Sequence, residues 1–161
     1  MLALRHRFLA SSMTQVVPQA KLYDRDFVAW CDHTVAQLKA GQLSHIDLEH
    51  LIEEIEGLAG RDRRELASRL EVLLSHLIKR CYLALTENYR GWELTIREQR
   101  RELRILLKQS PSLRPYLAQI FDETWDVALS ELRQDYPTAQ LPEIWPFSRE
   151  IEALLSEAFW Q

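Results

Sequence analysis

The stretch that decides the fold is DRRELASRLEVLLSHLIKRCYLALT, residues 62–86. Its apolar residues recur every three or four positions, which is the period of one face of an α-helix. The main stripe consists of Leu66, Leu70, Leu73, Leu74, Leu77, Cys81 and Ala84. Val72 and Leu83 form a weaker stripe nearly opposite. A helix that is apolar on two sides usually packs against neighbours on both, so this stretch is predicted to be the central helix of a bundle.

Helical periodicity also predicts the segments on either side. Gly41 is placed to end one helix and Asp47 to cap the next, and the pair Gly57 and Gly60 predicts a break or kink before residue 62. Ser148 is expected to cap a last helix. No stretch alternates with the period of a half-buried strand. We therefore expect an all-α, single-domain bundle of five to six helices, over residues 24–40, 47–60, 62–86, 92–109, 112–135 and 148–160.

Each of the first two predicted helices carries an apolar stripe at helical spacing. The stripe of the first helix consists of Phe27, Val28, Trp30, Cys31, Val35 and Leu38. The stripe of the second consists of Leu48, Leu51, Ile52, Ile55, Leu58 and Ala59. Both helices are therefore predicted to be amphipathic.

Two segments are predicted to lack helix. Residues 136–147 contain three prolines among apolar side chains that need burial, so we expect an ordered, Pro-rich strap across the bundle. Its apolar residues are Leu141, Ile144, Trp145 and Phe147. Residues 1–20 are expected to be a disordered or mis-started tail, because Met13 would also open a sensible chain. Residues 21–161 are then one helical domain.

The composition bounds the class of protein. The chain has 161 residues, 47% of them hydrophobic and 27% charged, which is ordinary globular usage. A net charge of −4 gives no global attraction for nucleic acid or an anionic membrane, and no stretch approaches the roughly 20 apolar residues of a membrane span. Cys31 and Cys81 do not have the spacing of a metal motif and are expected to be reduced thiols, which predicts a cytoplasmic protein.

Five motifs, taken in order, carry a resemblance to a known family. They are LYDRDFVAW at 22–30, DLEHLIEEIE at 47–56, LLSHLIK at 73–79, WELTIR at 92–97 and SPSL at 110–113. Together they resemble the bacterial family called domain of unknown function 29, over about Leu22 to Phe147. The resemblance implies a bacterial, cytoplasmic, helical protein that begins shortly before Leu22, and it brings no established activity, substrate or catalytic residue. After Lys79 the chain departs from the family's pattern, because RCYLAL replaces a more polar stretch.

The acidic second helix raises the question of a metal site. Glu49, Glu53 and Glu56 share one face of that helix. Carboxylates that project into a bundle and are joined by a histidine form metal sites, which makes Glu53, Glu56 and His76 candidate ligands. The diagnostic Glu-x-x-His pair is absent, however, and exposed acids near a helix start that pair with arginines explain the same residues. No cofactor is therefore expected.

Acid/base chemistry has one candidate group. His76 and Lys79 are the polar members of the weaker stripe, and His76 would titrate near neutral pH, with Glu54 as a further candidate. The alternative is a histidine hydrogen-bonded to a neighbouring carboxylate and a lysine whose stem covers apolar surface while its amine reaches water. The chain has no Gly-x-Ser-x-Gly elbow, no Gly-rich phosphate loop and no Cys-x-x-Cys. No motif names a reaction.

A basic stripe is the sharper polar signal. Arg97, Arg100, Arg101 and Arg104 lie on one side of the predicted helix 92–109. Such a stripe can follow a phosphate backbone, and Trp92 at the helix start could stack on a base. Acids interleave with these arginines at Glu93, Glu98 and Glu102, which together with the negative net charge favours a salt-bridged, solvated face.

These observations rank three hypotheses. The leading one is a non-enzymatic protein-interaction module that binds another protein or a second copy of itself, since aromatic clusters near the C-terminus and complementary charged faces are typical of contact surfaces. The second is a metal-dependent or acid/base enzyme with a Glu/His site. The third is nucleic-acid binding through the arginine stripe.

Overall fold

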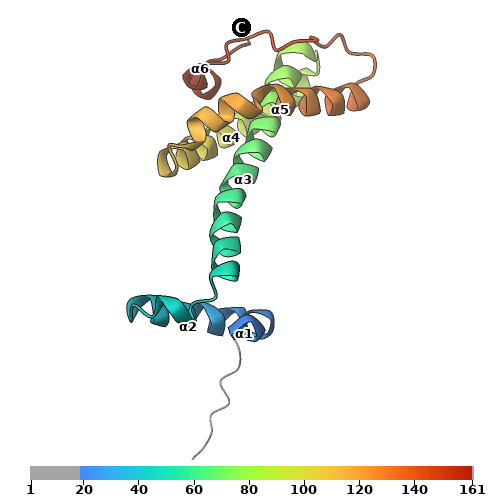
Figure 1. Ribbon diagram of the computed structural model, residues 1–161. Helices are drawn as coiled ribbons and strands as arrows, with labels where there is room; N and C mark the ends of the chain where they lie inside the picture. Colours follow the sequence, from blue (N-terminus) through green and yellow to red (C-terminus); the bar gives the residue numbers. More distant parts are fainter. Residues whose placement is uncertain (1–18, 161) are drawn as a thin grey trace, which may run out of the picture. The chain divides into compact units, whose positions relative to one another are not determined.

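The structure is a computed structural model that describes residues 19–160, with side chains from residue 22 onward. Over this range every regular element is a helix and no strand occurs, which confirms the all-α prediction (Figure 1). The α-helices are α1 Gln19–Arg25, α2 Phe27–Lys39, α3 Leu48–Tyr82, α4 Tyr89–Gln109, α5 Leu113–Asp135 and α6 Ile151–Ser156. Two 3-10 helices, η1 Leu43–His45 and η2 Thr86–Asn88, lie between them.

The chain divides into two compact units. The first unit ends at Glu56 and the second begins at Gly57, so that α3 contributes to both. The expectation of a single domain over residues 21–161 stays a prediction.

Local signals set the ends of α2. Asp26 is its N-cap, and its Oδ1 accepts a hydrogen bond from the backbone N–H of Ala29 at 3.0 Å. After the helix, Gly41 has a φ of +70°, a left-handed conformation that glycine adopts without steric penalty. The backbone N–H of Gly41 donates to the carbonyl of Leu38 at 3.1 Å. Gly41 therefore ends α2 as its position predicts.

The core of the first unit is small. Trp30 is 2% exposed and Ile46 is 9% exposed. The ring of Tyr23 lies edge-on to Trp30 at 5.0 Å and stacks on His50 at 4.0 Å, measured between ring centroids. Ring contacts that join α1, α2 and the start of α3 thus stabilise this unit.

The predicted break at Gly57 and Gly60 is wrong. Helix α3 runs without interruption from Leu48 to Tyr82, 35 residues in all. A glycine inside a helix costs about 0.5–1 kcal/mol relative to alanine, but the surrounding Glu, Leu, Ala and Arg residues favour helix and no proline interrupts them. Asp47 is the cap expected at its start, since its Oδ1 accepts a hydrogen bond from the backbone N–H of His50 at 3.5 Å.

The second unit has a continuous hydrophobic core. Side chains from α3, α4, α5 and α6 form it, and the α3 residues Leu66, Leu70, Leu73, Leu74, Leu77 and Ile78 are fully buried. On the weaker stripe Val72 is half-buried. Because α3 ends at Tyr82 and not at Thr86, Ala84 lies outside the helix and is exposed, contrary to the prediction.

The segment between α5 and α6 has no α-helix, and its burial is uneven. Trp145 is 5% exposed and lies edge-on to the rings of Trp125 and Phe147, with 5.3 Å between centroids in each pair. Ile144, which was expected to be buried, is 75% exposed. Whether this segment acts as a strap stays a prediction.

The last helix is shorter than predicted. Helix α6 begins at Ile151, and Ser148 does not cap it, because the Ser148 Oγ accepts from the backbone N–H of Glu150 at 3.2 Å, before the helix starts. The helix ends at Ser156 instead of Trp160, since the backbone of Glu157 is extended.

Candidate functional site

The arginine stripe of α4 is divided between the interior and the surface. Arg100 is only 7% exposed; its Nε donates to the carbonyl of Leu154 at 2.8 Å and its Nη2 to the carbonyl of Glu157 at 2.5 Å. Arg104 donates to the carbonyl of Leu155. The last carbonyls of a helix have no partner within it, and a cation there is favourable. These two arginines therefore hold the C-terminal end of α6.

Burial changes the electrostatics of this contact. It lowers the pKa of Arg100, because removal from water disfavours the charged form, and the nearby charge of Arg104 acts in the same direction. A guanidinium remains protonated at any physiological pH. Helical spacing alone could not distinguish Arg100 from the exposed arginines of the stripe. An arginine at the edge between the buried and the exposed face of a helix can direct its long side chain toward either.

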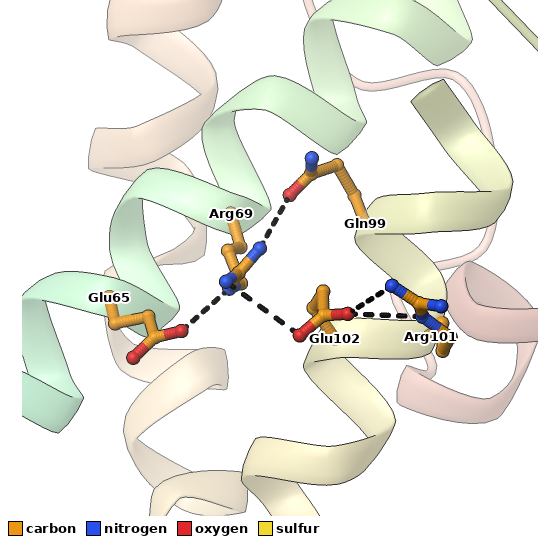
Figure 2. Close-up of polar contacts among 5 residues, drawn as sticks. All are labelled: Glu65, Arg69, Gln99, Arg101 and Glu102. Carbon is orange, nitrogen blue, oxygen red and sulfur yellow. Dashed lines mark hydrogen bonds and ion pairs between the residues drawn. The ribbon is translucent and has the colours of Figure 1, made fainter. Parts of the chain in front are cut away.

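Arg101, on the exposed side of the stripe, belongs to a network of polar contacts between α3 and α4 (Figure 2). The guanidinium of Arg101 donates to Glu102 Oε1 at 3.0 and 2.7 Å. The other carboxylate oxygen of Glu102 lies 3.8 Å from Nη2 of Arg69. Arg69 also donates to Glu65 at 2.8 Å and to Gln99 at 3.4 Å. A face of this kind matches the salt-bridged alternative from the sequence.

Trp92 and Arg97 complete the predicted interaction face. Trp92 is buried, and its ring lies 5.9 Å from that of Tyr89, so it is a packing residue at the start of α4. Arg97 is exposed and lines a shallow hollow with Leu94, Glu98 and Arg101. The structure thus brings Arg97 and Arg101 together on the surface and buries Arg100 and Trp92. Arg104 is exposed, and its guanidinium donates to the carbonyl of Leu155.

His76 and Lys79 both make local contacts in the second unit. His76 Nδ1 lies 2.8 Å from the carbonyl oxygen of Val72, so Nδ1 carries the proton and donates it. Burial lowers the pKa of His76, which keeps the ring neutral at pH 7. The ammonium of Lys79 lies 5.9 Å from the centre of the Tyr136 ring. The partner of His76 is therefore a backbone carbonyl rather than the carboxylate that sequence reasoning supplied.

The glutamate candidates lie in the first unit. Glu54 accepts a hydrogen bond of 2.6 Å from the hydroxyl of Tyr23, and this bond raises the pKa of Tyr23 to about 12. Glu53 and Glu56 are exposed. Among residues 19–160, no group of three His, Cys, Asp or Glu side chains is placed to hold a metal ion. Glu53, Glu56 and His76 are thus not gathered into a ligand set there.

Apolar side chains dominate the surface of α2. The helix buries Trp30, Thr34 and Gln37. Its other side, which we call the α2 apolar face, consists of Phe27 (47% exposed), Val28 (68%), Val35 (45%) and Leu38 (44%). A stripe of this kind usually faces a core. Here only Trp30 of the predicted stripe does so.

A second exposed stripe lies at the start of α3. The α3 apolar face consists of Leu48 (57% exposed), Ile52 (54%), Ile55 (57%) and, one turn further on, Leu58 (54%). Its spacing is the predicted one, but its side chains do not enter a core. Single exposed apolar residues are normal, whereas a contiguous set marks a contact surface. The exposure of these two faces could not be predicted from the sequence, because periodicity identifies an apolar face without identifying what covers it.

Comparison with known proteins gives a family and no annotated relative. The family model described as Domain of unknown function DUF29 matches residues 22–160. No curated protein and no solved structure matches the chain. In the part of the chain that the structure describes, no helix is long and apolar enough to cross a membrane.

Proposed function

This chain belongs to the family described as Domain of unknown function DUF29, as its five motifs predicted, and we propose that it is a protein-interaction module. The observation that carries the proposal is the apolar surface of the first unit. That surface comprises the α2 apolar face, Leu43, and the residues Leu48, Ile52 and Ile55 of the α3 apolar face.

The small core of the first unit supports association. Among its described large apolar side chains it buries only Trp30 and Ile46, while eight others are at least 44% exposed. A unit that buries so few apolar side chains gains little stability from its own core, and a disulfide, a metal or a partner would add to it. Cys31 is a free thiol, and the described residues offer no metal ligand group. A bound protein would supply the burial that the unit lacks.

The other two hypotheses have less support. A nucleic-acid groove would need the arginine stripe, but Arg100 and Arg104 hold α6 and Trp92 is buried. An acid/base site would need His76 and Lys79 to be available, but both make local packing contacts. We place the module in the bacterial cytoplasm, because its two cysteines are free thiols.

Site-specific photocrosslinking in the native host tests the proposal. A photoreactive residue, p-benzoylphenylalanine, replaces Val28 or Ile52 in the first unit, or Val127 on α5 as a control of comparable exposure. We expect discrete protein adducts from the first two positions and none from Val127, with the adducts identified by mass spectrometry. If positions 28 and 52 give no adduct, or react only within their own chain, the proposal is wrong.

A further inference from the structure

We propose that the α3 apolar face binds the same face of a second copy of this chain, with the two helices antiparallel about a two-fold axis at Ile55. This inference rests on the proposed function and names the partner for one of its two apolar faces. Three observations carry it: the shape of the stripe, the order of charges along α3 and the register that satisfies both.

The stripe has the geometry of a helix-packing seam. Leu48 and Ile55 are seven residues apart, as are Leu51 and Leu58, which is the heptad spacing of two helices that pack along each other. Leu51 is half-buried, and the other three are more than half exposed. A seam with this spacing fits another helix better than it fits a flat or globular surface.

The charges beside the stripe are ordered along the helix. Acids flank its first half at Glu49, Glu53 and Glu56, and bases follow at Arg61, Arg63 and Arg64. Within residues 19–160 none of these six side chains forms an ion pair. Three further acids of this stretch, Glu54, Asp62 and Glu65, have partners within the chain, which are Tyr23, Ser110 and Arg69 in that order. The guanidinium of Arg63 lies 5.9 Å from the Tyr116 ring, at the outer limit of a cation–π contact.

The order of charges along α3 favours a second copy of the same helix as the partner, in the antiparallel orientation. A parallel copy would set acid beside acid and base beside base, which is unfavourable. An antiparallel copy sets the acidic half of each helix beside the basic half of the other. The sequence is therefore complementary to itself in one direction only.

One register matches the apolar residues and the charges together. With the axis at Ile55, that residue meets its own equivalent and Ile52 faces Leu58 of the second copy. In the same register Arg63 of the second copy lies on the same flank as Glu49 and within about one helical turn of it. A two-fold interface of this kind repeats every contact twice.

The first test is the mass of the intact chain in solution. We expect light scattering coupled to size exclusion to give a dimer, and Ile55→Glu to weaken dimerisation at least tenfold. Val127→Glu is the matched control, since Val127 is 43% exposed on α5, and it should remain dimeric. Circular dichroism establishes that each variant is folded. A monomer at all concentrations overturns the inference.

The second test reports direction. In a Cys31→Ala/Cys81→Ala background, Ile55→Cys should give a covalent dimer with a short bismaleimide. Leu48→Cys should not, because two residues each seven positions from the axis lie about 21 Å apart along antiparallel helices. Equal crosslinking at both positions indicates parallel helices and overturns the antiparallel arrangement.

The third test reports the charge pairing. Glu49→Arg and Arg63→Glu should each weaken dimerisation roughly tenfold, because each reverses two symmetric pairs worth about 0.7 kcal/mol apiece. The double variant should recover most of the loss; no recovery overturns the register.

If the chain is monomeric but positions 28 and 52 still crosslink to another protein, this inference fails and the proposed function stands. If they crosslink to nothing, both fail.

Discussion

Two histidines illustrate how local partners change chemistry at the scale of a residue. His50 Nδ1 lies 2.7 Å from the Asp47 carboxylate, and this hydrogen bond raises the pKa of His50. His76 lies against a backbone carbonyl in a buried position, and burial lowers its pKa. Both are ordinary helix residues in the sequence. The pKa values of His50 and His76 shift in opposite directions because the two rings have different surroundings.

The two pKa shifts have opposite effects on stability. The contribution of His50 is fully present below its unfolded pKa of about 6.5 and is lost as pH rises through its folded pKa. His76 opposes folding as pH falls below about 6.5, because the unfolded chain then binds the proton more readily. We expect NMR titration of the ring protons, assigned with His50→Gln and His76→Gln, to place the two pKa values on opposite sides of 6.5. Values on the same side would contradict this account.

Arg100 marks the limit of sequence reasoning at this scale. Its spacing to Arg97 and Arg104 is correctly helical, but spacing does not distinguish an arginine that turns inward to bind carbonyls from one in water. The deciding partners, Leu154 and Glu157, are more than fifty residues away. The sequence of α4 therefore contains no signal that predicts its contact with the end of α6.

At the scale of the element, periodicity predicted most helices because their signals are local. The boundaries of α4 and α5 lie within a few residues of the predicted ones. The exception is α3, because Gly57 and Gly60 predict a break that their helix-favouring neighbours prevent. An unbroken α3 means that Gly57 is a weak point in a continuous helix.

Gly57→Ala tests that conclusion. A Cβ at Gly57 would meet nothing within 4 Å, and its backbone is helical. We therefore expect the substitution to raise the free energy of unfolding by about 0.5–1 kcal/mol, measured by urea denaturation.

Gly41→Ala is the matched control for this substitution. Its positive φ of +70° makes a side chain there unfavourable, and we expect a loss of about 1 kcal/mol. A destabilising Gly57→Ala would contradict a continuous α3.

At the scale of the whole molecule, the two units are stabilised differently. The second unit has a core of twenty buried residues, of which nineteen come from α3, α4, α5 and α6 and one, Trp145, from the segment between α5 and α6. The first buries few large apolar side chains and exposes many. An all-α composition was predictable from the sequence, but this asymmetry was not, because the same apolar pattern would serve a core or a surface.

Hydrogen exchange should detect the asymmetry. Local opening requires less free energy where few apolar contacts are broken. We expect the central amides of α2 to exchange at least tenfold faster than those of α5 in dilute protein, measured by mass spectrometry of peptides. Raising the protein concentration should slow exchange in the first unit. Equal protection of α2 and α5 would contradict this view.

The distribution of tryptophans makes the two units separately visible to spectroscopy. Trp30 is the only tryptophan in the first unit, and the other four, Trp92, Trp125, Trp145 and Trp160, belong to the second. A Trp30→Phe chain would report only the second unit by its fluorescence, and the difference from the parent chain would report only the first. If the two traces have the same midpoint, the units unfold as one; if not, each has a transition of its own.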